Sequence, residues 1–554
     1  MRFTKLLAPI SGALAVTVLT GSSLAAPSAK TPIQHVVVIF QENVSFDHYF
    51  GTYPVAKNTD GTKFTADPST PSVNALTNAL LTANPNFNPV TKLGNPFRLS
   101  ASQAATCDQD HDYGDEQAMF DAGMMDNFVA FNTGTSSPFC APAAGFNGDL
   151  NAGHPDDLIM GYYDGNTVTA LWNYAQNFAM NDSSFGTTFG PSSPGAINLV
   201  SGYTAGATQT SGTGDVTAGS LTNDAQPNGD ACTTRDSATM SGKNIGDRLN
   251  DAGLSWGFFE GGFDLTITNT DPTTGVQTTA CHRAHTSLTK GFTPKVDYIP
   301  HHEPFQYYSS TANPTHKRPS SVSAIGGSND GGVNHQYDSH DFFDALNAGN
   351  LPNVVFLKAP GYQDGHAGYS SPLDEQVFSV DTINQLQKSK FWNSTAVLIL
   401  YDDSDGWYDH QMGPIIMHSQ SDGAAGVNPA DSLTGPNQCG SATLGMQGPG
   451  RCGYGPRLPF LVISPWAKTN FVDHTVTDQT SAIAFIEQNC GLPVVTPATD
   501  TDPGSYDQYA GPITSMFDFT QKKGAVNSHK LFLDPVTGAV LKKAPKGDDG
   551  GNEP

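Results

Sequence analysis

Two pairs of oxygen-bearing residues and one serine are the candidates for chemistry in this sequence. Glu42-Asn43 lies near one end of the chain, Asp402-Asp403 lies far downstream, and Ser192 lies between them in a Pro-Ser-Ser-Pro segment. Carboxylate and amide oxygens are the ligands that Ca²⁺, Mg²⁺ and Mn²⁺ prefer. A serine beside such an ion can act as a nucleophile. These residues predict one divalent metal ion, with Ser192 contacting it and attacking phosphorus.

Ser192 precedes a predicted helix. Pro194 fits the first helical position, which would make Ser193 the helix cap and place Ser192 at the mouth of the helix. Free N–H groups and the positive end of the helix dipole would favour a phosphoryl group or a serine alkoxide there. On this segment alone, the two serines could equally be ordinary capping residues.

Each acid pair directly follows a β-branched apolar run that is typical of a buried strand. The first run covers 33–40 and the second covers 396–401. Open α/β sheets bind ligands beyond the carboxyl ends of their strands, so two pairs far apart in sequence can meet in one crevice. Either pair by itself could equally be a solvated turn or a helix cap.

The alternation of strands and helices predicts an α/β fold with a mainly parallel central sheet flanked by helices. Further strands are expected at 254–259, 353–357 and 458–464, and helices at 169–179, 374–387 and 481–488. A single domain is expected over 26–535. Within it, 205–335 is interpreted as an insertion of long loops that form a cap over the site. Residues 536–554 are expected to be a disordered tail.

Histidines form a third group of candidates: His111, His301, His302 and His366. A lone histidine is more often structural than catalytic, whereas His301-His302 forms a pair in a loop bounded by prolines. Such groups could bind phosphate oxygens or protonate a leaving oxygen, which would favour a mildly acidic working pH. A histidine-rich zinc site is the alternative, but Glu42 and Asn43 match zinc poorly.

The first 25 residues have the charged start, apolar run and small residues of a secretory signal peptide, with cleavage expected after Ala25. The apolar run is shorter than the ~20 residues that span a bilayer, so no stable membrane anchor is expected. Cleavage removes Arg2 and Lys5 and takes the formal charge from −25 to −27. This acidity argues against nucleic acid as a partner but not against small phosphate esters, because a metal ion can reverse the local field. A secreted or periplasmic protein is expected.

Seven cysteines in an exported chain favour disulfide bonds. Proximity in sequence suggests Cys107–Cys140, Cys232–Cys281 and Cys439–Cys452, with Cys490 left unpaired. The spacing alone leaves other connectivities open.

Several segments match the motifs of one bacterial family. They include HVVVIFQENVSFDHYFG at 35–51, MDNF at 125–128, GPSSP at 190–194, YDDSDGWYDH at 401–410 and GPRLPFLVISP at 455–465. The chain resembles, from about residue 33 to about residue 490, the bacterial phosphoesterase family that contains phospholipases C and acid phosphatases of the acid phosphatase A type. The resemblance implies a core like that of the alkaline phosphatase superfamily.

The resemblance also implies roles for individual residues. The metal would be held by the pairs Glu42-Asn43 and Asp402-Asp403, and the serine or threonine nucleophile would be Ser192. The pocket residues implied by the family are His111, Asp126, His301, His302 and His366. His111 and Asp126, together with Asn43, would bind the phosphate, and His301, His302 and His366 would take part in catalysis.

The chain departs from the phospholipase pattern around the nucleophile. That branch usually carries Thr at the nucleophile and Asn-Arg after the second proline, whereas this chain has Ser192 and Gly195-Ala196. We therefore expect a metal-dependent acid phosphatase that hydrolyses phosphate monoesters through a phosphoserine on Ser192. The alternative is a phospholipase C-type phosphodiesterase acting on phospholipid head groups. An inactive exported protein that binds a metal or ligand is a third interpretation.

Overall fold

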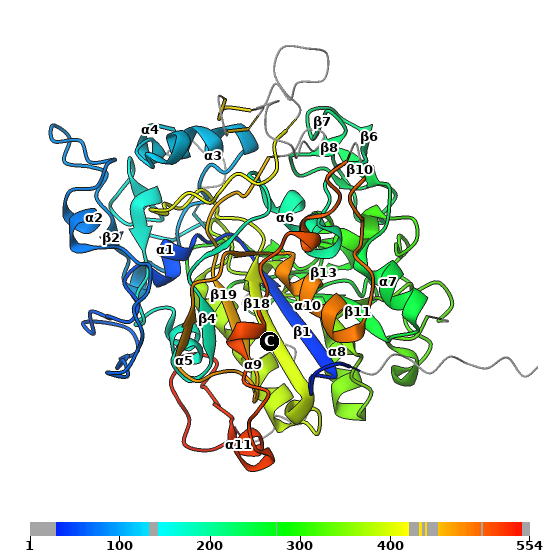
Figure 1. Cartoon of the computed structure of the whole chain (residues 1–554). Helices are drawn as coiled ribbons and strands as arrows, with labels where there is room; N and C mark the ends of the chain where they lie inside the picture. Colours follow the sequence, from blue (N-terminus) through cyan, green and yellow to red (C-terminus); the bar gives the residue numbers. More distant parts are fainter. Residues whose placement is uncertain are drawn as a thin grey trace, which may run out of the picture.

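The computed structural model describes residues 29–131, 142–272, 274–328, 330–419, 431–434, 438–439, 452–499 and 502–545. Its centre is an eight-stranded sheet in the order β16-β11-β17-β1-β18-β19-β4-β20 (Figure 1). In that order the strands are Gln336–Asp338, Trp256–Glu260, Val354–Lys358, His35–Gln41, Thr395–Tyr401, Phe460–Ile463, Ala179–Asn181 and Phe471–Asp473. The five strands from β16 to β18 run parallel, and β19 is antiparallel to both of its neighbours. The predicted α/β class with a mainly parallel sheet is confirmed.

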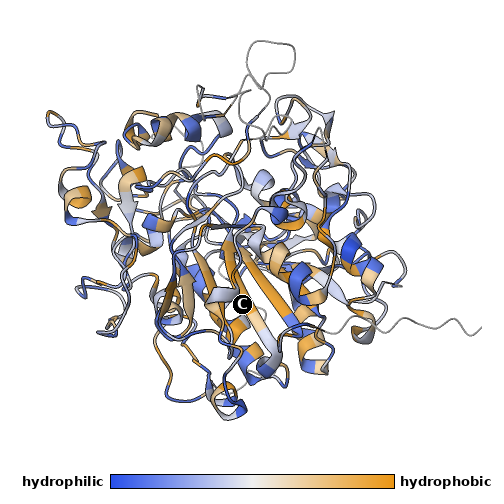
Figure 2. Cartoon of the chain, viewed as in Figure 1, coloured by the Kyte–Doolittle hydropathy of each residue, from blue (hydrophilic) through white to orange (hydrophobic). Residues whose placement is uncertain are grey.

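The central strands are apolar on both faces. Every residue of β1, β17 and β18 is buried, and β1 is mostly orange in Figure 2. A parallel sheet covered on both faces produces continuous apolar runs of this kind, which is why the sequence revealed these strands to within two residues.

Helices flank the sheet, and those predicted at 169–179, 374–387 and 481–488 are confirmed. The longer ones are α5 (Thr169–Asn177), α6 (Ser192–Ser201), α7 (Ile245–Ala252), α8 (Ser339–Ala348), α9 (Pro372–Lys388) and α10 (Ser481–Cys490). Helix α5 packs against β4 and β19, and α8 packs against β11. The shorter helices are α1 (Phe46–Phe50), α2 (Asn78–Thr82), α3 (Tyr113–Phe120), α4 (Phe128–Phe131) and α11 (Lys523–Ser528).

The insertion contains short strands where the sequence suggested loop. The first group is β6 (Ala207–Ser211), β7 (Val216–Thr217), β8 (Ser220–Leu221), β9 (Gln226–Pro227) and β10 (Ser237–Met240). The second is β12 (Thr268–Thr270), β13 (Gln277–Thr279), β14 (Ala284–His285) and β15 (Lys295–Val296). Two further small pairs join β2 (Phe97–Arg98) to β3 (Gly161–Tyr162) and β5 (Ser184–Phe185) to β21 (Thr477–Asp478). Such short polar strands lack the apolar periodicity that predicts longer ones.

The two ends of the chain are described only in part. The expected signal peptide, 1–25, lies outside the described residues, as does 546–554. Within the expected tail, the Val536 carbonyl accepts a hydrogen bond from Gln376 and the Gly538 carbonyl accepts one from Asn173. The described part of this tail, up to residue 545, therefore includes contacts with α5 and α9.

Two predicted disulfides are confirmed, Cys232–Cys281 and Cys439–Cys452. Cys107 is also disulfide-bonded, and its expected partner, Cys140, lies outside the described residues. Cys490 is free and buried, as predicted. Among the described helices, none combines the length and the apolar character needed to cross a bilayer.

Candidate active site

The register of two neighbouring strands brings the acid pairs together. Strands β1 and β18 are parallel, and Gln41 pairs with Tyr401 at their carboxyl ends. Glu42 and Asp402 are the next residues, so both pairs begin at the same level beyond the sheet. The Asn43 N–H donates a hydrogen bond to Asp402 Oδ1 at 3.1 Å, and all four residues of the two pairs are buried.

The buried oxygens of these pairs fit a hard cation. Within the described part of the chain, Asn43 Oδ1 and Asp403 Oδ2 are buried and have no hydrogen-bond partner. Buried polar atoms are nearly always paired, so two such oxygens beside the Glu42 and Asp402 carboxylates are suited to hold a metal ion. Asn43 also has a φ of 48°, in the left-handed region that non-glycine residues seldom adopt outside constrained sites.

Ser192, the first residue of α6, lies beside the same acid pairs. Its Oγ donates a hydrogen bond to Glu42 Oε2 at 3.2 Å, and the residue is 2% exposed. Figure 1 shows α6 beyond the ends of the central strands. The structure therefore brings the proposed nucleophile to the proposed metal ligands.

The start of α6 differs from the prediction. The helix begins at Ser192 with Pro191 as its cap, two residues earlier than the expected start at Pro194. A proline is tolerated throughout the first turn because its missing N–H would have no partner within the helix. The Ser193 N–H donates to Asp224 Oδ1 at 2.9 Å, so this helix N–H already has an anionic partner.

A lysine that the sequence analysis did not single out lies between the acid pairs. Lys358 ends β17, its ammonium contacts Glu42 Oε1, and it lies 3.4 Å from Asp402 Oδ2. Burial raises the pKa of Glu42 and the nearby Asp402 charge raises it further, while Lys358 opposes both. The signal for this residue was one basic side chain at the end of an otherwise apolar strand.

A buried glutamate connects the nucleophile loop to the second acid pair, and it too was missed. Glu116 Oε2 accepts a hydrogen bond from the Gly190 N–H at 2.9 Å, and its Oε1 accepts one from Ser404 Oγ at 2.5 Å. Ser404 directly follows Asp403. Glu116 thus couples the position of the loop before Ser192 to that of a proposed metal ligand.

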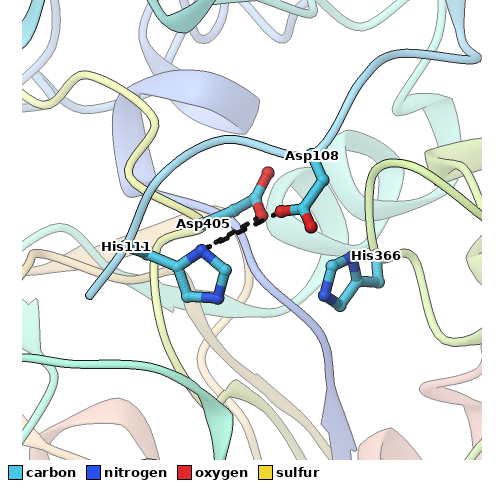
Figure 3. A group of neighbouring side chains, drawn as sticks. All are labelled: Asp108, His111, His366 and Asp405. Atoms are coloured by element: carbon cyan, nitrogen blue, oxygen red, sulfur yellow. Dashed lines mark ion pairs between the residues drawn. The ribbon is translucent and has the colours of Figure 1, made fainter. Parts of the chain in front are cut away.

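Three of the predicted histidines lie around this centre. His111 Nε2 is 3.4 Å from Asn43 Nδ2, and His302 Nδ1 is 3.5 Å from Glu42 Oε1. The rings of His111 and His366 are 6.3 Å apart (Figure 3). His301 is turned toward the insertion, where its Nε2 lies 3.9 Å from Asp224.

Two aspartates, which the sequence analysis did not assign, hold His111. Asp405 and Asp108 gather at its Nδ1, at 3.7 Å and 3.9 Å (Figure 3). His111 Nδ1 also lies 2.9 Å from the Gln109 carbonyl oxygen. A carbonyl oxygen can only accept, so Nδ1 carries a proton and Nε2 is the atom next to Asn43.

The electrostatic environment separates His111 from the other histidines. Burial lowers the pKa of His111, but Asp403 and Asp108 more than offset this and raise the pKa to about 10. Burial lowers the pKa of His302, and the charge of Lys358 lowers it further. Burial and then the charge of His111 lower the pKa of His366. Burial also lowers the pKa of His301 to about 3. Among these four histidines, His111 is therefore the one whose pKa the surrounding charges raise.

Asp126 is the predicted site residue that the structure does not bring to the others. It is half-buried in the segment before α4. Burial raises its pKa, and the neighbouring Asp121 raises it further. Among the described residues, Asp126 makes no hydrogen bond or ion pair with Ser192 or with either acid pair. Its phosphate-binding role remains a prediction.

Comparisons with known proteins add a family and named relatives. The model of the Phosphoesterase family matches residues 33–493. The chain is 32% identical to a non-hemolytic phospholipase C of Pseudomonas aeruginosa over 176 residues, which is 31% of this chain and 24% of that protein. It is 24% identical to phospholipase C B of Mycobacterium tuberculosis over 94% of this chain and 84% of the relative.

A solved structure of murine ectonucleotide pyrophosphatase / phosphodiesterase 5 aligns with 63% of this chain and 95% of its own, at 13% identity and a TM-score of 0.28. That score is too low to support an argument about either fold or function. The chain spans only about a quarter of the length of the Pseudomonas relative.

Proposed function

Because the chain belongs to the Phosphoesterase family, we propose that it is a phosphoric ester hydrolase and that it cleaves its substrates through a phosphoserine on Ser192. The observation that carries this proposal is the 3.2 Å hydrogen bond from Ser192 Oγ to Glu42 Oε2. Glu42 belongs to the same two acid pairs as Asn43 and Asp403, whose Oδ1 and Oδ2 atoms are buried without a hydrogen-bond partner among the described residues. A serine that only caps a helix would not donate a hydrogen bond to a buried carboxylate such as Glu42.

Glu42, Asn43, Asp402, Asp403 and Ser192 are the residues that would hold one divalent ion. When bound, the ion would lower the pKa of the Ser192 hydroxyl and stabilise charge on the phosphoryl oxygens. The oxygen-only ligand set favours Ca²⁺, Mg²⁺ or Mn²⁺.

The first chemical step forms one bond and breaks another at phosphorus. Ser192 Oγ releases its proton to water and bonds to phosphorus, while the bond between phosphorus and the alcohol oxygen breaks and that oxygen takes a proton from His302 or His366. The cationic His111 and the Asn43 amide would donate hydrogen bonds to the non-bridging oxygens. Water would then attack the phosphoserine, releasing phosphate or a phosphate monoester and restoring Ser192.

His302 and His366 are the candidates to protonate the leaving alcohol. Both are neutral in the environment described above, because burial lowers their pKa values. A bound phosphate anion would favour their charged forms and so raise these pKa values. We propose that substrate binding causes one of these histidines to take up the proton that it later donates. We also propose that His301 acts through His302, because their ring centres lie 4.6 Å apart.

The relatives favour the phospholipase C-type interpretation over the acid phosphatase that the sequence analysis preferred. Both curated relatives described above are phospholipases C, and one of them matches nearly the whole chain. We therefore propose phosphodiesters of the phospholipase C type as a substrate class. Phosphate monoesters are the second candidate, because Lys295 forms no ion pair with an acidic residue in the described part of the chain. Export is likewise proposed, on the strength of the disulfides.

Replacing Ser192 with alanine tests the mechanism. Ser192→Ala should abolish turnover of both phosphatidylcholine and an aryl phosphate monoester while the fold and metal binding survive. Ser193→Ala is the matched control, because Ser193 is also buried and lies in the same helical turn. Mass spectrometry of the acid-quenched wild-type enzyme should find phosphate on Ser192. Near-normal turnover by Ser192→Ala would refute the proposal.

A further inference from the structure

Lys295, the first residue of β15, has a side-chain ammonium with no ion-pair partner among the described residues. Among the described residues it makes no hydrogen bond and no ion pair. Its Nζ instead lies 3.4 Å from the centre of the Tyr369 ring, and its side chain is half-buried. A cation over an aromatic face is attracted to it, but that attraction does not replace the hydration lost on burial. Lys295 is therefore suited to meet an anion that comes from solution.

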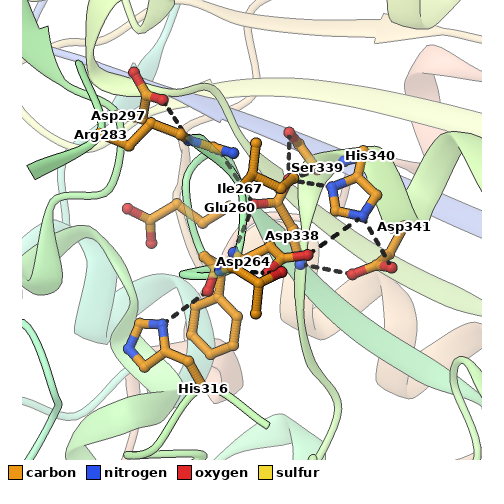
Figure 4. Close-up of polar contacts among 12 residues, drawn as sticks. Glu260, Asp264, Ile267, Arg283, Asp297, His316, Asp338, Ser339, His340 and Asp341 are labelled. Atoms are coloured by element: carbon orange, nitrogen blue, oxygen red, sulfur yellow. Dashed lines mark hydrogen bonds and ion pairs between the residues drawn. The ribbon is translucent and has the colours of Figure 1, made fainter. Parts of the chain in front are cut away.

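The backbone beneath Lys295 is held firmly. Strand β15 pairs with β14, where His285 lies opposite Lys295. Two residues further on, Asp297 is bonded at 2.7 Å to both Arg283 and His285. Arg283 also reaches Asp338, at 3.5 Å, at the start of α8 (Figure 4). These buried ion pairs fix the β14–β15 pair to the main sheet, so Lys295 is presented by a rigid support.

Tyr369, on which Lys295 rests, is itself fixed beside the proposed catalytic histidines. Its hydroxyl donates a hydrogen bond to Asp364 Oδ2 at 3.1 Å, and its ring stacks on His366 at 4.3 Å. The Asp364 carbonyl accepts the Glu42 N–H at 3.0 Å. Tyr369 is thus linked through Asp364 to Glu42, a proposed metal ligand, and its ring packs against His366.

The charge of Lys295 acts on the interior of the pocket. It is attracted to Asp364, Glu42 and Asp108, and it repels Arg235. After the larger effect of burial, it contributes to lowering the pKa of His302 and of His366. Charges of both signs therefore surround this place, and Lys295 adds a positive charge beside His302 and His366.

We propose that Lys295 binds a second negative charge of the substrate, so that the enzyme prefers dianionic phosphate esters over esters of a cationic alcohol such as choline. This inference rests on the proposed function, and of its two candidate substrate classes it favours the second, phosphate monoesters, over choline diesters of the phospholipase C type. A monoester dianion offers Lys295 a charged oxygen in addition to those near Asn43 and His111. A choline diester has one negative charge on phosphate and brings a quaternary ammonium into a pocket that already holds cations. The shared chemistry is the phosphate dianion, which a soluble monoester or a lipid such as phosphatidic acid can supply.

Two aryl esters with the same leaving group provide the test, one a phosphate monoester and the other a phosphorylcholine diester. Lys295→Met should lower kcat/KM for the monoester by roughly ten- to a hundredfold, the effect of losing one charged hydrogen bond, and should leave the choline ester nearly unchanged. Lys295→Arg should restore most of the preference. Lys290→Met, an exposed lysine on the same segment, is the matched control. Phosphatidic acid and phosphatidylcholine in mixed micelles repeat the comparison for a lipid source.

Calorimetry with inorganic phosphate separates this inference from the proposed mechanism. In a Ser192→Ala background, adding Lys295→Met should weaken phosphate binding by roughly tenfold or more. That measurement needs no turnover, so it tests whether Lys295 binds phosphate even if the wild-type enzyme hydrolyses neither ester. Equal losses on the two esters would show a structural role and overturn the inference. Unchanged phosphate affinity would overturn it as well.

Discussion

Gly195 allows the nucleophile helix to approach the second acid pair, and an added methyl group should separate them. A Cβ built on Gly195 would lie 2.1 Å from the Asp402 carbonyl oxygen and 3.0 Å from Asp402 Cα. Ordinary contacts of this kind exceed 3 Å, so α6 or Asp402 must move by about 1 Å. The three atoms nearest to the new methyl group are all backbone atoms of Asp402, which cannot rotate away.

The cost of Gly195→Ala can be estimated from this displacement. Overpacking of this kind destabilises by about 1–3 kcal/mol, against a helix-propensity gain of up to about 1 kcal/mol from alanine. A shift of about 1 Å between a nucleophile and the groups it works with can lower the rate on the order of a hundredfold. We therefore expect Gly195→Ala to lose roughly two orders of magnitude in kcat/KM and to bind the divalent ion more weakly.

Urea unfolding, metal titration and ester hydrolysis should be measured on Gly195→Ala and on a matched helical glycine. Gly524 in α11 is that control, because a Cβ there would meet no atom within 4 Å. Gly524→Ala should keep full activity and gain up to about 1 kcal/mol. Activity within threefold of wild type in Gly195→Ala, with no loss of stability, would refute the close-approach argument.

Two further predictions concern pH and metal. Burial lowers the pKa of His340, but its 2.9 Å contact with Asp338 raises it to about 9, from 6.5, so the stabilisation is complete below pH 6.5 and is lost as pH rises toward 9. Thermal unfolding at a series of pH values should show the wild-type free energy of unfolding falling by at most about 3 kcal/mol across that window. His340→Gln should not show this fall, and parallel profiles for the two proteins would contradict the assignment. Chelation should abolish turnover, and Mg²⁺, Ca²⁺ or Mn²⁺ should restore it. Asp403→Asn should raise the Kd of the restoring ion on the order of tenfold or more, while the exposed Asp112→Asn should not, and activity that survives exhaustive chelation would exclude the proposed ligand set.

Much of the site follows from local sequence signals. Each acid pair is marked by the change from an apolar strand to polar residues, and β1 and β18 are neighbours in register, so the two pairs had to converge once both strands joined one parallel sheet. Ser192 was marked by its position at the start of a helix. These features depend on a few consecutive residues, whose preferences are strong enough to be read without the rest of the chain.

Other parts of the site came only from tertiary packing. Glu116 and Lys295 lie in segments without a distinctive pattern, and Lys358 was marked only as a basic residue at the end of an apolar strand. Each acts on the site through contacts or charges that cross more than 200 residues of sequence. The start of α6 was also decided by its neighbours, since Asp224 from the insertion accepts the Ser193 N–H. The sequence by itself determined which residues could bind a metal ion and attack phosphorus. The tertiary structure decided which charges surround them, because a charge acts through space on whatever the fold brings near it.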